Sequence, residues 1–342
     1  MKKGWKITIM VLAGILLTYG ILAVFPRPDN FVGENPMRKD GEMPILIAHG
    51  GGNREFPDNT LEAFYNAYSV DPRVMMETDV SITRDGVLIL SHDTTLDRKT
   101  NVTGAIADWN YSDLIALKVD FGYTNPTTDG VLTGEREHFR GPDGLEKYPT
   151  DVSYPDGTEP RDETVFLATT LEELLLAFPE NRINVEIKQS GELGYQALAE
   201  ALRLLEIHDA FDRVVLASFH EEIYDRYCQL AENGEVPDTF MFSPAYDSAT
   251  AFFVLQMLKL DLFYHDSICV FQLPTEELGF RLATRGLVNA AHRHNLAVHY
   301  WTINDEDEMR HLIDIGADGI MTDYPHRLQE VYASYDSAGE GT

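Results

Sequence analysis

The chain has 342 residues, of which 44% are hydrophobic and 24% charged, and its formal net charge is −29 at neutral pH. This composition is that of a folded protein, and the length suits one large domain or two ordinary ones. The acidic excess argues against a nucleic-acid partner, because nucleic-acid backbones are bound by surplus lysine and arginine.

The first 25 residues differ in character from the rest. From Ile7 to Phe25 the segment contains no charged residue. Lysines stand before it at positions Lys2, Lys3 and Lys6. A run of about 20 apolar residues is long enough for a helix to cross a bilayer. We therefore expect an uncleaved transmembrane signal anchor at residues 1–25.

The orientation of this anchor follows from its lysines. By the positive-inside rule they keep the N-terminus in the cytoplasm, so the rest of the chain, as the extracytoplasmic domain of a single-pass membrane protein, faces outward. The main alternative is a cleaved signal peptide, which favours a shorter apolar core and an A-x-A site. No A-x-A follows the apolar run, and no cysteine follows it for a lipid anchor.

The next segments lead into the domain. Residues 26–43 are rich in Pro, Gly, Asn and charge, which is typical of a linker. The segment PILIAHGGG begins at residue 44 and predicts a short apolar strand. Glycines follow it directly after His49. The segment NTLEAFYNAYSV has apolar residues at helical spacing. Asn59 is placed to cap this helix, and Glu62 stands where a capping-box partner would.

Two strand-like runs, VMMETDVSI and VLILSH, come next, and an Asp-Gly turn signal separates them. Helical patterns lie between most of the later apolar runs. Those runs are INVEIK (183–188), RVVLASF (213–219), TFMFSP (239–244), ICVFQLP (268–274), AVHYWTIN (297–304) and DGIMTD (318–323). Strands that alternate with helices indicate a parallel sheet and an α/β fold.

Eight or nine such strands in roughly 300 residues fit a (β/α)₈ TIM barrel, here at residues 44–330. If one run lies outside the barrel, we expect it to be ICVFQLP. Residues 122–165 show no clear hydrophobic period, so we expect an insertion there. We expect residues 331–342 to form a flexible tail. Two cysteines, Cys228 and Cys269, are too few for a disulfide framework, and a single bridge between them stays open.

Carboxylates stand inside or at the end of two apolar runs. Residues two apart in a strand point the same way, so Glu77 and Asp79 share one face. Two buried like charges repel each other unless a cation joins them. Glu186 repeats the anomaly in NVEIK. Three carboxylates at the carboxyl ends of barrel strands, where catalytic residues collect, suit a hard divalent cation: Mg²⁺, Ca²⁺ or Mn²⁺.

Two histidines close apolar runs in the same way. His49 ends ILIAH and His92 ends LILSH. A metal and two histidines in one barrel mouth suggest general acid–base chemistry. Lys188 lies two residues beyond Glu186 and would point into the same mouth, where it could hold a phosphate oxygen. Each residue alone more often has a structural role, but five at strand ends favour a catalytic site.

The ordered motifs of the chain resemble the glycerophosphodiester phosphodiesterases, which are metal-dependent (β/α)₈ enzymes. The resemblance runs from about Ile45 to Pro325. It rests on AHGGG with PDNTLEAF, METDV, TRDGVLILSHDTTLDRKTNVTG, TLEELL, VEIK, VLASF, YWTIN and DGIMTDYP, in that order. Residues 122–165 look like the insertion that many members carry.

This resemblance implies a role for each candidate residue. His49 and His92 look like the acid–base pair, with Lys188 as a phosphate contact. The implied metal ligands are Glu77, Asp79 and Glu186. Trp301 is similar to the family's aromatic residue near the glycerol pocket, with an ordinary core aromatic as the alternative.

Two positions depart from the family's usual pattern. Gly50 stands where an arginine usually follows the first histidine, and Asp58 stands where a glutamate usually precedes the Asn-Thr pair. By the resemblance, the missing arginine puts phosphate binding at that corner in question. Arg54 or Lys188 would have to compensate.

The implied activity is the hydrolysis of glycerophosphodiesters to glycerol phosphate and an alcohol, on the outer side of the membrane. Deacylated phospholipids, lysophospholipids and teichoic-acid-type polymers all contain the linkage. One alternative is a non-catalytic surface binding module on the same barrel, for which Gly50 and Asp58 speak. Another is a related phosphodiesterase that acts on phosphoinositides or sphingomyelin.

Overall fold

A computed structural model of the chain describes residues 2–39, 43–122, 138–154, 158, 166–237 and 240–339. Eight parallel strands follow one another in the order β6-β5-β4-β2-β1-β11-β10-β7. Their bounds are β1 Ile45–Ala48, β2 Met75–Ile82, β4 Ile183–Ile187, β5 Val214–Ala217, β6 Met241–Phe242, β7 Val270–Leu273, β10 Ala297–Tyr300 and β11 Gly319–Thr322. Between the two outer strands, the Cys269 amide donates to the Phe242 carbonyl at 3.3 Å. The predicted TIM barrel is therefore confirmed as a nearly closed barrel.

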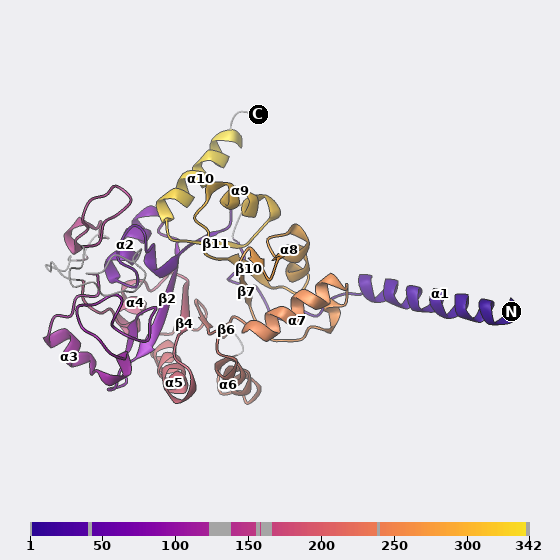
Figure 1. Ribbon diagram of the computed structural model, residues 1–342, viewed down its shortest axis with the longest axis horizontal. Coiled ribbons are helices and arrows are strands. Elements are labelled where there is room, and N and C mark those ends of the chain that lie inside the picture. The colour runs from indigo at the N-terminus through magenta and orange to yellow at the C-terminus, as the bar shows by residue number, and fades with distance from the viewer. Residues whose placement is uncertain are drawn as a thin grey trace.

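Helices surround these strands (Figure 1). A further helix, α1 Lys2–Val24, lies apart from them. The surrounding helices are α2 Leu61–Val70, α3 Tyr111–Ala116, α4 Leu171–Ala177, α5 Gly191–Ile207, α6 Glu221–Glu232, α7 Tyr246–Met257, α8 Arg285–His292, α9 Glu306–Ile315 and α10 Pro325–Gly339. Helix α5 shows why they pack there, because Ala197, Ala201 and Leu204 recur on one face and are buried. Short 3₁₀ turns are η1 His49–Gly51, η2 Ile106–Asp108, η3 Pro149–Asp151 and η4 Asp261–Phe263.

The strand outside the barrel is not the one that we expected. ICVFQLP supplies β7, which pairs in parallel with β10. The run VLILSH supplies β3 Leu88–Leu90, which pairs antiparallel with β2. The Asp-Gly turn causes this, because a tight hairpin returns the chain beside the strand it has just left. A second small hairpin joins β8 Glu276–Glu277 to β9 Phe280–Arg281.

The segment predicted as a linker packs against the barrel instead. Phe31 and Met37 are buried there. The side chain of Asn35 donates to the carbonyls of Cys269 and Asn295, both at 2.7 Å. Apolar contacts and satisfied amides fix this segment, at least up to residue 39. Residues 40–42 of the predicted linker lie outside the described residues.

The structure describes most of the predicted tail and only parts of the predicted insertion. Helix α10 extends to Gly339, and Val331 and Tyr332 on it are buried, so the predicted tail begins within a helix. Its flexibility stays a prediction. Of the predicted insertion, residues 123–137, 155–157 and 159–165 lie outside the described residues. Both cysteines are free, so no bridge joins them.

Helix α1 leaves the barrel as a separate rod (Figure 1). The Tyr19 hydroxyl donates to the Leu258 carbonyl at 2.7 Å, and Arg27 pairs with Asp261 at 2.8 Å. Among the residues that the structure describes, no helix has both the length and the apolarity needed to cross a membrane. The transmembrane anchor at residues 1–25 stays a prediction.

Candidate active site at the mouth of the barrel

Three predicted carboxylates meet at the carboxyl ends of neighbouring strands. Glu77 and Asp79 lie on β2, and the register of β2 with β4 sets Asp79 opposite Glu186. One oxygen from each of the three carboxylates lies within 4.8 Å of the others. The exposed fractions of Glu77 and Asp79 are only 3% and 2%. Strand period and strand pairing together therefore produce one acidic cluster.

The charge of this cluster is only partly balanced. The Lys188 ammonium lies 2.9 Å from the Glu186 carboxylate and 3.5 Å from Asp79. The Gly50 amide donates to Glu77 at 2.8 Å. Burial, and then the charge of Asp79, raise the pKa of Glu77 to about 8. Burial and Asp79 also raise the pKa of Glu186. Three carboxylates facing one lysine fit a divalent cation with oxygen ligands.

His49 is held by a carboxylate that directly follows the last barrel strand, β11. Its Nδ1 donates to Asp323 Oδ1 at 2.7 Å, and its Nε2 lies 3.9 Å from Glu77. Burial works to lower the pKa of His49, but Glu77 and Asp323 outweigh it and raise this pKa to about 10. The Asn304 amide donates to the second oxygen of Asp323 at 2.6 Å. This arrangement leaves Nε2 of His49 directed toward the acidic cluster.

His92 reaches the mouth from the β3 hairpin and not from a barrel strand. The Ser91 amide donates to the Asp79 carbonyl at 2.9 Å, which keeps His92 beside the cluster. Its Nδ1 donates to Asp93 at 2.9 Å, and this bond raises the pKa of His92. Arg98 in turn donates to Asp93 at 2.5 Å. Each histidine is thus oriented through Nδ1 by an aspartate, and Nε2 stays available.

Asn59 does not cap helix α2 as the sequence predicted; it lies one residue before the cap. The N-cap of α2 is Thr60, whose side chain accepts from the Ala63 amide. Asn59 has a positive φ of 58° and donates to Asp79 Oδ2 at 3.1 Å. Its side-chain oxygen accepts from the Thr78 hydroxyl at 2.6 Å. Asparagine tolerates this backbone region, so the loop aims an amide at a cluster carboxylate.

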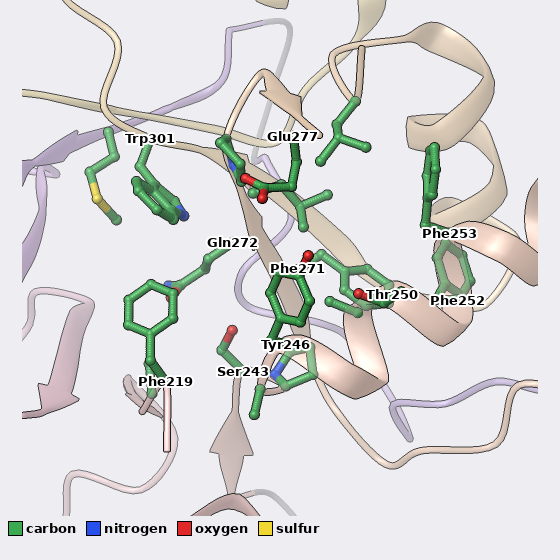
Figure 2. A pocket seen from close by; sticks show the side chains of 18 of the residues that line it. Phe219, Ser243, Tyr246, Thr250, Phe252, Phe253, Phe271, Gln272, Glu277 and Trp301 are labelled. Carbon is green, nitrogen blue, oxygen red and sulfur yellow. The ribbon is translucent and has the colours of Figure 1, made fainter. Parts of the chain in front are cut away.

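One cavity of about 790 Å³ joins the acidic cluster to a wider apolar space. Its polar end is formed by His49, His92, Lys188 and the three carboxylates. Trp301 also lines it, in edge-to-face contact with Phe219 at a centroid distance of 5.8 Å (Figure 2). The structure therefore brings seven of the eight predicted site residues into one cavity.

Residues 49–327 match the model of the Glycerophosphoryl diester phosphodiesterase family, and this range is more than half of the chain. The chain belongs to this family. The prediction of a phosphoric diester hydrolase is thereby confirmed.

Known relatives cover nearly the whole chain. Probable glycerophosphodiester phosphodiesterase 2 of Mycobacterium tuberculosis is 26% identical, over 85% of this chain and 96% of its own. Lysophospholipase D GDPD1 of Rattus norvegicus is 24% identical, over 93% of this chain and 94% of its own. The structure of an Oleispira antarctica phosphodiesterase in complex with the product sn-glycerol-3-phosphate has a TM-score of 0.59 at 18% identity, over 85% and 97% of the two chains. At this level of identity, the structural similarity shows the shared fold alone.

The glycine that departs from the family pattern contributes its backbone to the site of this phosphodiesterase. Gly50 has a φ of +55°, a region that glycine adopts readily. A Cβ at this position would lie 3.1 Å from the Asp58 Cβ. Among the described residues that line the cavity, Lys188 is the one lysine or arginine. The predicted contact of Lys188 with a phosphate stays a prediction, and no arginine of the described cavity wall shares that role.

Arg54 is the predicted site residue that the structure leaves outside the cavity. Its Nε lies 3.8 Å from Asp323, behind His49, and its side chain is absent from the described cavity wall. Its predicted contact with substrate stays a prediction. The observed contact places Arg54 instead among the groups that surround Asp323.

The second departure, Asp58, is tied to two cations that the sequence reasoning missed. Asp58 lies 3.3 Å from the Lys99 ammonium and 3.8 Å from Arg98. Both Asp58 and Lys99 are buried. Burial acts to raise the pKa of Asp58, but Lys99 and Arg98 outweigh it and lower this pKa. Because Arg98 also holds Asp93, the network connects Asp58 to the orienting partner of His92.

Proposed function

We propose that this protein is a metal-dependent glycerophosphodiester phosphodiesterase that releases glycerol phosphate and an alcohol. The observation that carries the proposal is the buried cluster of Glu77, Asp79 and Glu186, whose ligand oxygens lie within 4.8 Å of one another. The similarity to the Mycobacterium glycerophosphodiester phosphodiesterase, and to the Oleispira phosphodiesterase with its product glycerol phosphate, supports the proposal.

The three carboxylates of this cluster would hold the cation. Their hard oxygen donors favour Mg²⁺, Ca²⁺ or Mn²⁺. A bound divalent cation would neutralise charge on a non-bridging phosphate oxygen and orient the substrate. Lys188 adds a second positive charge beside the same carboxylates, where it would contact another phosphate oxygen.

The histidines would move the protons. Both direct Nδ1 to an aspartate, so Nε2 is the atom that exchanges a proton with the reactants. One histidine would take a proton from the nucleophile, which is either water or a neighbouring glycerol hydroxyl. The other would protonate the leaving alcohol. Attack through the glycerol hydroxyl would give a cyclic phosphate that water then opens.

Activity assays test this proposal with the full-length chain. We expect glycerol phosphate to be released from glycerophosphocholine when Mg²⁺, Ca²⁺ or Mn²⁺ is present. Chelator should abolish the reaction, and added cation should restore it, because the cluster carries excess negative charge without a cation. The released product would be measured with a coupled glycerol-phosphate assay. Turnover that persists in chelator would contradict metal dependence. No turnover by folded protein would favour the binding module.

We also propose that α1 anchors the catalytic barrel at the outer face of a membrane. The apolar run from Ile7 to Phe25 supports this, as do exposed side chains on α1, such as Met10 and Leu16, at 73% and 69%. Contiguous exposed apolar side chains are unfavourable in water and mark interaction sites.

Cell fractionation tests the anchor. We expect the full-length chain in the membrane fraction after a carbonate wash, with the barrel accessible to protease from outside. Leu12→Lys combined with Leu16→Lys should release it, because charge within the span opposes insertion. Leu145→Lys with Leu176→Lys, at exposed positions of the barrel segment, is the matched control. Wild-type protein in the soluble fraction would overturn this proposal.

A further inference from the structure

The cavity has a second end that the reaction does not use. It extends from the acidic cluster to α7 and to the hairpin of β8 and β9. Figure 2 shows side chains at this end, among them Phe253 on α7 and Glu277 on the hairpin. We call this end the apolar arm. It is lined by Phe253, Val254, Met257, Leu258, Leu278 and Phe280. Several of these side chains are solvent-exposed, and Leu278 reaches 81%. Contiguous exposed apolar surface of this kind marks a binding site.

We propose that the apolar arm binds the hydrocarbon chain of a glycerophosphodiester that carries a single acyl or alkyl group. The natural substrate is then a lysophospholipid. This inference rests on the proposed function, because it places the phosphodiester of the same molecule at the acidic cluster. One continuous cavity holds both ends, so one amphipathic molecule can occupy them together.

The chemistry of the wall separates this substrate from the other candidates. A glycerol-phosphate polymer would bring hydroxyls and charges against apolar side chains, which offer them no partners. A deacylated diester, such as glycerophosphocholine, would leave the arm unfilled. A hydrocarbon chain gains from leaving water, in proportion to the apolar area it buries. Among the described residues of α7 and of the hairpin that line the cavity, Tyr246, Thr250 and Glu277 carry polar groups (Figure 2), and the others are apolar.

The position of the arm agrees with a lipid origin for the substrate. Leu258 lines the arm, and its carbonyl accepts the bond from Tyr19 of α1. Arg27, just beyond α1, pairs with Asp261 three residues further on. Helix α1 therefore joins the barrel beside the open apolar side of the cavity. If α1 lies in a membrane, a single-chain lipid has a short path into the arm.

A substrate series tests the inference. The full-length protein in phosphatidylcholine nanodiscs would be given glycerophosphocholine and lysophosphatidylcholines of increasing chain length, below their micelle concentrations. We expect kcat/KM for choline release to rise with chain length, by up to about fourfold for each methylene buried. The rise should stop when the arm is full. A flat series would overturn the inference.

A variant separates binding in the arm from partitioning into the nanodisc. The measured quantity is the ratio of kcat/KM for the longest lysophosphatidylcholine to that for glycerophosphocholine. Phe280→Asp should lower this ratio by about tenfold or more, because it sets a charge where methylenes were buried. Ile207→Asp, at an equally exposed apolar residue outside the cavity, should keep the wild-type ratio. An unchanged ratio in Phe280→Asp would overturn the inference.

A binding measurement keeps this result independent of catalysis. Decylphosphocholine would be titrated into the wild type, Phe280→Asp and Ile207→Asp by calorimetry. Saturable binding that only Phe280→Asp weakens supports the arm even if no diester is cleaved, in which case the proposed function alone fails. Turnover of glycerophosphocholine without saturable decylphosphocholine binding overturns the arm and leaves the proposed function intact.

Discussion

Glu77→Gln is expected to lower kcat for glycerophosphocholine about a thousandfold, the scale at which preorganised electrostatic stabilisation acts. The substitution keeps the shape of the side chain and removes one of three clustered carboxyl groups. It should also weaken cation binding, because a carboxylate ligand becomes a neutral amide. The loss should exceed the loss in substrate affinity, since charge at phosphorus grows in the transition state.

The measurement is a steady-state assay at saturating cation, with cation affinity determined separately by calorimetry. Glu180→Gln is the matched control, because Glu180 is exposed and precedes β4 at the opposite end of the barrel. We expect it to keep wild-type rates. Full activity in Glu77→Gln would show that the metal assignment is wrong, whereas equal losses in both variants would indicate a general effect of the substitution.

The acidic cluster was predictable because it depends on two regular geometries. A strand places residues two apart on one face, and parallel barrel strands end at a common mouth. Glu77 and Asp79 follow from the first rule, and Glu186 from the second. Neither rule needs the tertiary structure, so these carboxylates could be grouped from their sequence positions alone.

The histidine environment was only partly predictable. His92 was expected at the end of a barrel strand, but the Asp-Gly turn makes its strand the second arm of a hairpin. Asp323 directly follows β11, and its signal was an acidic residue closing the run DGIMTD. Nothing local shows that this carboxylate faces His49, because 274 residues separate the two. Such pairs follow from the closure of the barrel.

The segment after α1 shows a further limit of composition. Its Pro, Gly and Asn content predicted a linker, yet Asn30 and Asn35 serve there as specific hydrogen-bond donors or acceptors. The Asn30 side-chain oxygen accepts from Nδ1 of buried His294 at 2.7 Å. Asparagine is frequent in linkers and is also well suited to bridging backbone carbonyls, and the sequence does not distinguish these uses.

Asp323→Asn is expected to lower kcat by roughly 10³–10⁴, with a much smaller effect on KM, by analogy with the loss of an orienting aspartate in serine proteases. Asp323 does not line the cavity, so it is a positioning residue that acts through His49. An amide in its place can donate to Nδ1 and so favour the tautomer protonated on Nε2. In that tautomer, neutral His49 cannot accept a proton at the atom that faces the cluster.

Kinetics and stability together test this role. Thermal unfolding should show that Asp323→Asn stays folded, because the amide keeps the size of the carboxylate and can still bond to Asn304. Asp212→Asn, at an exposed aspartate before β5, is the matched control and should keep wild-type kcat. Asp323→Glu, which restores the carboxylate, should recover part of the rate. A loss confined to KM, or equal losses in Asp323→Asn and Asp323→Glu, would contradict the orientation of His49 by this carboxylate. A kcat loss that the glutamate partly rescues would tie catalysis to the proton on Nδ1 of His49.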